Sequence, residues 1–311
     1  MAVLSVVIVS YNTVVLLHDC INSILSTSDM DSTEIIVVDN ASVDDSVAMV
    51  RQKFPAVRLL VQNENVGFGA ANNVGVAASS APYVMLLNSD AILLSNTARS
   101  LIRYLEENPG VSCVGPRIVL PNGQRQRRAF GNLPTVRRIA MQSVCLGLLF
   151  PRVAAFEGVD GGDRPGPEDK VGWITGVCMM MRRLDFVAAG GFDPTIFMYC
   201  EDIDLCWRLS GDGSKIVRLD DHPVLHFGGG SSPSTTAQVR NSRLQQRNLL
   251  NIIQIHSGRL ASNVTAILIL LGLAPRIVAG VCFLPMKGLR HNMILLSSWF
   301  RILDLVKLSR L

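Results

Sequence analysis

Three acids stand close together in the second half of the chain: Glu201, Asp202 and Asp204 fall within four positions. Carboxylates this close repel one another, so the group is typical of a place where a cation or a transferred proton is held. If the segment is helical, Asp204 lies one turn before Arg208 and can pair with it. Glu201 and Asp202 then stand at the first turn and face a cleft. The structural alternative is a charged helix start that the helix dipole stabilises.

Three short apolar runs early in the chain each end in polar residues. These polar ends are Ser10-Tyr11-Asn12, Asp39-Asn40 and Asn88-Ser89-Asp90. Asp90 could bind Mg2+ or Mn2+ while the ion also contacts a diphosphate, and Asp39 could accept hydrogen bonds from a base or ribose. The alternative for each segment is a turn that caps the following element.

Two further segments carry candidate binding groups. Asn65 to Asn73 is glycine-rich and opens a predicted helix; its Asn65, Gly67 and Asn72 contact a nucleotide or satisfy buried backbone. The G-x-G-x-x-G pattern fails because Asn72 occupies its last position, and the chain contains no P-loop sequence. His226 follows an apolar run and offers an imidazole to a metal, although a lone histidine is more often structural.

The elements that must position these residues are strands and helices in alternation. Continuous β-branched runs at 6–9, 35–38 and 84–87 suit strands of a parallel sheet that is buried on both faces. Open sheets of this kind bind ligands outside the carboxyl ends of their strands. The predicted fold is therefore α/β, a mostly parallel central sheet flanked by helices. Later in the chain, the patterns predict a helix at 201–209 and a short strand at 222–226.

Charge divides the chain into an acidic body and a basic tail. Residues 1–239 hold 19 Lys and Arg against 24 acids, whereas residues 240–311 hold ten against one, Asp304. The tail is also rich in Leu and Ile, which favours an anionic membrane surface and not nucleic acid as its partner. Residues 264–284 are long enough to span a bilayer, but Pro275-Arg276 interrupts them. We expect two interfacial helices there; a span, a hairpin or a helical cap on the core are the alternatives.

Taken in order, seven segments resemble family-2 glycosyltransferases of the GT-A (nucleotide-diphospho-sugar transferase) fold, in particular the bacterial rhamnosyltransferase-like branch that builds cell-surface polysaccharide. The segments are VVIVSYNT (6–13), IIVVDNASVDDS (35–46), NENVGFGAANNVG (63–75), VMLLNSDAIL (84–93), WITGVCMMMRR (173–183), GGFDPTIFMYCEDIDLCWRL (190–209) and VLHFGGGSS (224–232). Together they cover most of residues 1–235.

The resemblance implies an inverting transfer of a sugar from a dTDP- or UDP-linked donor. Asp202 matches the general base and Glu201 its neighbour, Asp90 the last acid of the metal-binding motif, and His226 a histidine that completes the metal site in some relatives. Asn88 replaces the first acid of that motif, which leaves Mg2+ or Mn2+ with fewer carboxylates. The expected nucleotide contacts are Ser10, Tyr11, Asn12, Asp39, Asn65, Gly67, Asn72, Asn88 and Asp90. Trp173, Thr175 and Gly176 are expected to line the sugar and acceptor pocket.

The resemblance also implies an organisation and a location. We expect a catalytic domain at 1–235, with a nucleotide-binding half at 1–115 and an acceptor half at 116–235, followed by a membrane-associated tail at 236–311. Rhamnose is the favoured sugar and a glycan or polyprenyl-linked saccharide the expected acceptor, at the cytoplasmic face of the plasma membrane. The arginines from Arg125 to Arg138 contact a diphosphate or merely solvate a loop. A nucleotidyltransferase and a non-catalytic, membrane-associated nucleotide-binding protein are the alternative functions.

Overall fold

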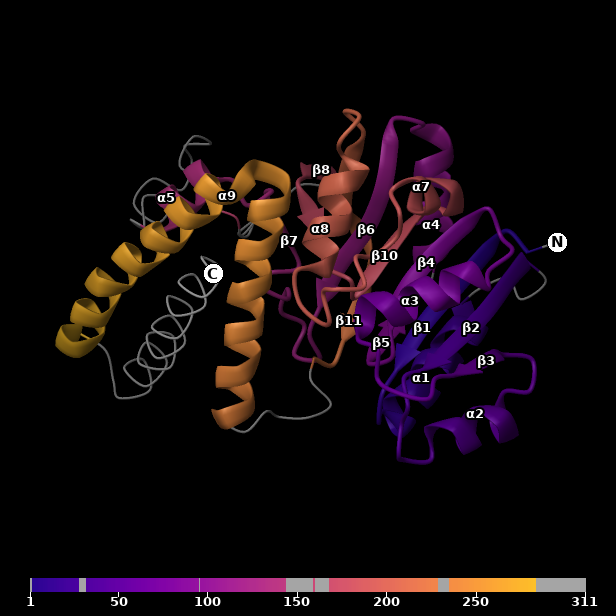
Figure 1. The fold of residues 1–311 in the computed structure, drawn as a ribbon. Helices are drawn as coiled ribbons and strands as arrows, with labels where there is room; N and C mark the ends of the chain where they lie inside the picture. Colours follow the sequence, from indigo (N-terminus) through magenta and orange to yellow (C-terminus); the bar gives the residue numbers. More distant parts are fainter. Residues whose placement is uncertain are drawn as a thin grey trace. The chain divides into compact units, whose positions relative to one another are not determined.

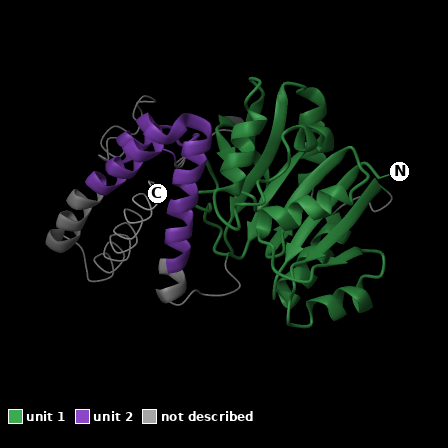
Figure 2. Ribbon diagram, viewed as in Figure 1, with its two compact units in different colours: residues 1–131, 162–231 green, residues 132–161, 232–311 purple. Residues whose placement is uncertain are grey.

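The chain folds into two compact units. The computed structural model describes residues 2–27, 32–94, 96–143, 159, 168–228 and 235–283. Unit 1 comprises residues 1–131 and 162–231, and unit 2 comprises residues 132–161 and 232–311 (Figure 2). Residues 132–161 thus group with the tail. The chain after residue 283 and most of the segment 144–167 lie outside the described residues.

Unit 1 is built around one large sheet. The order of its described strands is β3-β2-β1-β4-β10-β6-β11-β5, with β8 beside β11 (Figure 1). The strands are β1 (Leu4–Ser10), β2 (Thr33–Asp39), β3 (Arg58–Val61), β4 (Tyr83–Asn88), β5 (Ala91–Leu93), β6 (Val111–Val119), β8 (Glu168–Val171), β10 (Cys178–Arg182) and β11 (Lys215–His226). A separate antiparallel pair joins β7 (Phe130–Gly131) to β9 (Trp173–Ile174).

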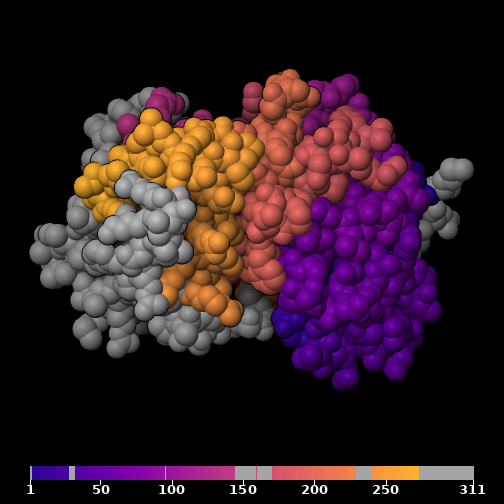
Figure 3. Space-filling view, viewed as in Figure 1, coloured from indigo at the N-terminus to yellow at the C-terminus, as the bar shows by residue number. Residues whose placement is uncertain are grey.

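The described helices of unit 1 alternate with these strands. They are α1 (Val14–Thr27), α2 (Ser46–Lys53), α3 (Phe68–Ala77), α4 (Thr97–Glu107), α7 (Arg183–Ala188) and α8 (Glu201–Leu209). The space-filling view shows one continuous surface formed by the early part of the chain and the segment that carries α8 (Figure 3).

The predicted mostly parallel sheet is confirmed. β1 lies between β2 and β4 and is parallel to both, β2 is parallel to β3, and β6 is parallel to β11. β10 runs antiparallel between β4 and β6. Every residue of β1 is buried, as the continuous β-branched run predicts for a strand covered on both faces.

Helix α3 approaches the sheet closely because it presents a glycine there. A Cβ built on Gly75 lies 2.3 Å from a methyl carbon of Val7 on β1 and 3.1 Å from one of Val38 on β2. Any side chain at this position pushes the helix away from the strands. The small residues of α3, the helix that follows the glycine-rich loop, thus allow it to lie close to β1 and β2.

Strand β11 is longer than the sequence predicts. The expected strand covers 222–226, whereas the observed one begins at Lys215. The polar residues Arg218, Asp220 and Asp221 break the apolar pattern, and the pairing of β11 with β6 shifts register between Leu219 and Val224. The strand tolerates this polar centre because the Arg218 guanidinium stacks over the Phe130 ring, 4.1 Å from its centroid.

Unit 2 pairs α5 (Val136–Ser143) with α9 (Thr235–Phe283). Ile139, Val159 and Ile253 form its buried cluster. The sequence predicts an interruption at Pro275-Arg276, but α9 stays helical to Phe283. The break in α9 lies at Gly258, where φ is +86°. Glycine adopts this left-handed conformation without the penalty that a side chain brings, so the chain bends there.

Candidate active site

The polar ends of β1, β2 and β4 meet at one edge of the sheet. Because the three strands are adjacent and parallel, Ser10 pairs in register with Asp39, and Val9 pairs with Asn88. The hydroxyls of Ser10 and Thr13 lie 3.0 Å apart, and Thr13 donates to the hydroxyl of Ser89 at 3.0 Å. This chain of hydroxyls ties the end of β1 to the turn that carries Asn88 and Asp90.

Asn12 and Asp39 organise the loops after β1 and β2. The Asn12 amide donates to the Ser42 hydroxyl at 2.9 Å, and its side-chain oxygen accepts from the Val43 amide at 2.8 Å. Asp39 accepts from the Ser42 amide at 3.0 Å through Oδ2. Its Oδ1 is buried and has no hydrogen-bond partner among the described residues. Tyr11 exposes its ring beside these loops.

The glycine-rich loop is held from both sides. Asn40 donates to the side-chain oxygen of Asn65 at 2.9 Å, and that oxygen also accepts from the Gly67 amide at 3.0 Å. Gly67 has a φ of +88°, and a Cβ there lies only 2.3 Å from the carbonyl oxygen of Phe197. Glycine is therefore required on both conformational and steric grounds.

In this conformation, Asn72 is not exposed to a bound nucleotide. It is buried, and its side chain donates to the Phe68 carbonyl at 3.0 Å, one turn earlier in α3. The nucleotide roles of Asn65, Gly67 and Asn72 stay predictions. The geometry assigns these residues a structural part in shaping the loop.

Asp90 and His226 come together across the β5–β11 pair. Nε2 of His226 lies 3.0 Å from Oδ1 of Asp90, and Nδ1 lies 2.6 Å from Oε1 of Gln126. The Phe227 amide also donates to the Asp90 carbonyl at 3.0 Å. An oxygen therefore faces each ring nitrogen of His226.

These residues fit a divalent cation. Asp90 offers a carboxylate, His226 an imidazole, and Asn88 a buried side-chain oxygen that lacks a hydrogen-bond partner in the described part of the chain. No group of three or more His, Cys, Asp or Glu converges within the described residues. The protein therefore supplies few ligands, as is usual for Mg2+ sites completed by phosphate oxygens.

Glu201 and Asp202 begin α8 directly after a strained turn. Tyr199 and Cys200 both have left-handed φ values, +69° and +70°, which are uncommon for residues with a side chain. Asp202 accepts from the Gly176 amide at 3.1 Å through Oδ2 and from the Ile203 amide at 2.8 Å through Oδ1. The carboxylate is thereby oriented from two elements.

The pKa values of both acids are raised. Burial raises the pKa of Glu201 to about 8, with a further contribution from the neighbouring Asp202 charge. Burial also raises the pKa of Asp202, although the hydrogen bonds from Gly176 and Ile203 oppose the shift. Oε2 of Glu201 and Nε1 of the buried Trp173 have no hydrogen-bond partners among the described residues. A carboxyl pair of this kind suits proton transfer near neutral pH.

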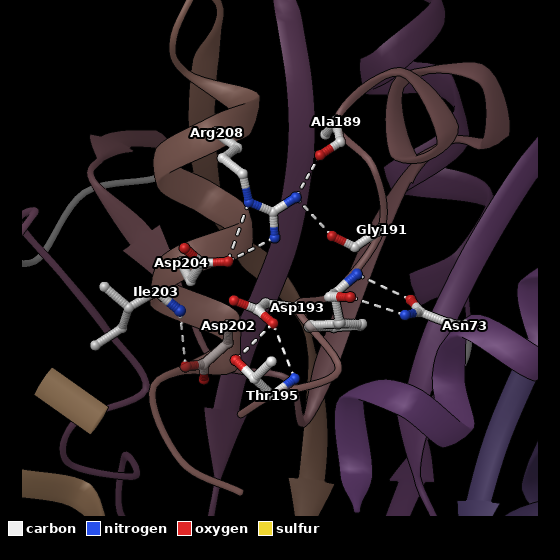
Figure 4. Close-up of polar contacts among 10 residues, drawn as sticks. Asn73, Ala189, Gly191, Asp193, Thr195, Asp202, Ile203, Asp204 and Arg208 are labelled. Carbon is white, nitrogen blue, oxygen red and sulfur yellow. Dashed lines mark hydrogen bonds and ion pairs between the residues drawn. The ribbon is translucent and has the colours of Figure 1, made fainter. Parts of the chain in front are cut away.

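The turn before α8 is held by Arg208 and Asn73 (Figure 4). Arg208 pairs with the buried Asp204 at 2.6 Å, as the spacing predicts, and donates to the carbonyls of Ala189 and Gly191. On the other side, the Asn73 side chain donates to the Phe192 carbonyl and accepts from the Phe192 amide, both at 2.8 Å. The segment that leads to the two acids is thus fixed at both edges.

Sequence reasoning missed Asn73 and Gln126. Each acts on a residue about 100 positions away, Asn73 on Phe192 and Gln126 on His226. The turn sequence Pro121-Asn122-Gly123 lies close to Gln126, but no local pattern identifies the histidine that Gln126 contacts. Of the expected pocket residues, Trp173 and Gly176 are buried and Thr175 is half-buried.

Comparisons with known proteins agree with the resemblance. The profile of "Glycosyl transferase family 2" matches residues 5–152. The N-acetylglucosaminyl-diphospho-decaprenol L-rhamnosyltransferase of Mycobacterium tuberculosis (strain ATCC 25618 / H37Rv) is 32% identical over 218 residues, which cover 65% of this chain and 69% of that protein. Rhamnosyltransferase WbbL of Escherichia coli (strain K12) is 32% identical over 177 residues, 51% of this chain and 59% of that protein.

A solved structure shares the fold. Mannosyltransferase PcManGT from Pyrobaculum calidifontis, in complex with GDP-Man and Mn2+, superposes with a TM-score of 0.59 at 13% identity and covers 97% of this chain and 87% of that one. This likeness confirms the predicted GT-A architecture. The family profile and the 32% identical rhamnosyltransferase of Mycobacterium tuberculosis show that the chain belongs to glycosyl transferase family 2 and is a glycosyltransferase.

Proposed function

We propose that the protein transfers a sugar from a nucleoside diphosphate donor to an acceptor hydroxyl with inversion at the sugar carbon. The observation that supports this most directly is the carboxyl pair at the start of α8. Asp202 is oriented by the Gly176 and Ile203 amides, and burial raises its pKa. In this role, Asp202 takes the proton of the acceptor hydroxyl as that oxygen attacks from the face opposite the diphosphate.

Glu201 contributes as a protonated neighbour of Asp202. Its carboxyl group is buried and has a raised pKa, so it holds a proton over much of the neutral range. A neutral neighbour lowers the repulsion that Asp202 would otherwise meet when it is ionised. Glu201 therefore keeps Asp202 available as a base.

The proposed donor-binding site is formed by residues at the ends of the strands. Asp39, with its buried Oδ1 lacking a hydrogen bond among the described residues, is the proposed partner of the base or ribose. Ser10, Tyr11 and Asn12 lie at the end of the neighbouring strand. Asp90 and His226 are the proposed ligands of Mg2+ or Mn2+, which would stabilise the negative charge of the departing diphosphate.

The relatives suggest the donor and acceptor classes. Two of them are named rhamnosyltransferases, and the name of one gives a diphospho-decaprenol acceptor. We therefore propose rhamnose, carried by dTDP or UDP, as the transferred sugar. A glycan on a polyprenyl diphosphate is the proposed acceptor, in the synthesis of cell-surface polysaccharide.

The basic tail is the proposed membrane contact. Within the described residues, the stretch Arg240–Gly272 is long and apolar enough to cross a bilayer by length and composition, but Gly258 divides it into two helices. It exposes apolar side chains at Leu260, Ile267 and Leu271. We propose that residues 236–311 lie on the cytoplasmic face of the membrane behind a catalytic domain at 1–235, whose halves at 1–115 and 116–235 bind nucleotide and acceptor.

The test is release of nucleoside diphosphate from a panel of dTDP-, UDP- and GDP-sugars, with Mn2+ or Mg2+ and then with EDTA. We expect slow, metal-dependent hydrolysis of one donor, and transfer once membrane extract supplies an acceptor. Asp202→Asn should reduce transfer about 10²- to 10⁴-fold, the usual contribution of a general base, and should leave donor binding intact. Asp212→Asn, at an exposed acid, is the matched control. Full transfer by the Asp202 variant would remove Asp202 from this role.

A further inference from the structure

The turn at residues 175–177, between β9 and β10, touches both halves of the proposed site. The Val177 carbonyl accepts from the Asn88 amide at 3.0 Å, on the side of the proposed metal. On the other side, the Gly176 amide donates to Oδ2 of Asp202 at 3.1 Å. The orientation of this turn therefore sets how well the carboxylate of Asp202 is held.

The ring of Phe68 covers this turn. A Cβ built on the buried Gly176 lies 2.9 Å from Cε1 and 3.2 Å from Cζ of Phe68, and its three nearest heavy atoms all belong to that ring. The φ of Gly176 lies outside the left-handed region. The position therefore requires glycine for steric reasons, because any side chain there must displace the ring or the turn.

Phe68 is itself held by its neighbours. Its amide donates to the Phe197 carbonyl at 3.0 Å, and its carbonyl accepts from the Asn72 side chain at 3.0 Å. Its ring meets the Phe192 ring edge-on, with 6.1 Å between the centroids. Phe192 and Phe197 belong to the segment that leads into α8. Phe68 thus contacts both the turn that binds Asp202 and the segment that carries it.

We propose that Phe68 is a positioning residue for Asp202: its ring keeps the Gly176 amide turned toward the carboxylate. Close-packed interiors transmit a change of side-chain volume to their neighbours, so a smaller residue at position 68 loosens the turn. The part assigned to Asp202 rests on the proposed function, whereas the link from Phe68 through Gly176 to Asp202 stands without it. The competing role is on the donor side, because Asn40, next to Asp39, also holds the glycine-rich loop.

Two substitutions act on this contact from opposite sides. Phe68→Leu removes Cε1 and Cζ and leaves the turn uncovered, whereas Gly176→Ala adds a methyl group that pushes the ring or the turn aside. In the double variant, the smaller leucine gives that methyl group room. Phe186→Leu is the matched control: Phe186 is buried and meets the same Phe192 ring edge-on at 5.8 Å, but it is not among the atoms nearest to Gly176.

Sugar transfer by the full-length protein is measured over a range of donor concentrations. We expect Phe68→Leu and Gly176→Ala each to lower kcat about 10- to 100-fold, the usual effect of misplacing a catalytic group, with the KM for the donor unchanged. The double variant should be more active than Gly176→Ala alone. Phe186→Leu should lower the unfolding midpoint through lost packing but keep the wild-type kcat.

The dependence of kcat on pH gives a second readout. The hydrogen bond from Gly176 lowers the pKa of Asp202, so weakening it raises that pKa. In Phe68→Leu, the fall of kcat toward acid pH should therefore begin about one pH unit higher than in the wild type. Glu201, Cys200 and Cys206 also interact with Asp202 and are unchanged in every variant.

Three kinetic results would overturn the proposal. A raised donor KM with an unchanged kcat would place Phe68 on the donor side. A double variant no more active than Gly176→Ala would mean that the methyl group blocks the pocket directly. An unchanged pH profile in Phe68→Leu would mean that the ring does not act through Asp202.

Urea unfolding separates this inference from the proposed function. Phe68→Leu and Asp202→Asn are combined in a double-variant cycle, and their effects on the unfolding equilibrium constant should depart from independence by about 3-fold or more. If they do so while the wild type transfers no sugar, the proposed function fails and the link stands. Independent effects in a protein whose transfer requires Asp202 would overturn the link and leave the function in place.

Discussion

Replacing Arg208 with glutamine should destabilise unit 1 by about 3–5 kcal/mol, the usual result of removing one partner of a buried ion pair. Asp204 is buried, and its Oδ2 lies 2.6 Å from Nη2 of Arg208. At an effective dielectric constant of about 20, this separation corresponds to a gross attraction of about 6 kcal/mol, which the desolvation of the two charges partly offsets. The carbonyls of Ala189 and Gly191 also lose a donor.

The chain contains a matched control for this substitution. Arg103 and Glu107 form the same i,i+4 pair on α4, at 2.7 Å, but both side chains are largely exposed. Exposed pairs of this kind contribute little, so Arg103→Gln should leave the unfolding midpoint unchanged. The double variant Asp204→Asn, Arg208→Gln should recover part of the loss, because the buried charge of Asp204 is removed together with the guanidinium that paired with it.

Thermal and urea unfolding, followed by far-UV circular dichroism, measure the difference. For a unit of this size, the expected loss corresponds to a midpoint lowered by about 6–20 °C. Transfer activity should fall as well, because Arg208 fixes the segment that leads to Glu201 and Asp202. An Arg208→Gln midpoint equal to that of Arg103→Gln would refute the reasoning, since burial would then make no difference to the pair.

Further predictions follow from individual contacts. Glu201→Gln should raise stability above pH 8. A pKa raised from 4.5 to about 8 means that the folded state binds more protons between these values, so wild-type stability falls by about 5 kcal/mol as pH rises through this window. Urea unfolding from pH 5 to 9 should show a flatter profile for the variant. Gln126→Leu should weaken Mn2+ binding about 10-fold, measured by electron paramagnetic resonance, because the variant loses the partner that orients the proposed metal ligand His226. Gln124→Leu is the control and should bind Mn2+ as the wild type does. Equal affinities of the two variants would show that Gln126 does not support the metal site. Gly75→Val should cost about 1–3 kcal/mol by overpacking against Val7, and a variant as stable as the wild type would contradict the close approach of α3 to β1.

Much of the fold is predictable because its signals are local. The runs that become β1, β2 and β4 are continuous and β-branched, and each ends at the polar residue that the structure places at the sheet edge. The pairing of Asp204 with Arg208 follows from helical spacing alone. Both kinds of pattern depend on neighbours a few positions apart, which one sequence displays directly.

The remainder depends on contacts between distant segments. The sequence shows an apolar run at 178–181 but not that it inserts antiparallel between β4 and β6. The hydrogen bonds from Asn73 to Phe192 and between Gln126 and His226 have no local pattern either. β11 is longer than predicted because polar residues from Arg218 to Asp221 break its apolar pattern, and the Phe130 ring over which Arg218 stacks lies far away in the sequence.

The insertion of β10 has a consequence for how the chain is made. β4 pairs with β1 on one side, but its other edge stays open until β10 arrives about 90 residues later. At about 5–20 residues per second, a ribosome exposes this apolar edge for several seconds or longer. The matched family segment, residues 5–152, ends before β10 and β11. That segment is therefore no independent folding unit, and its fragments should aggregate through the unpaired edge of β4.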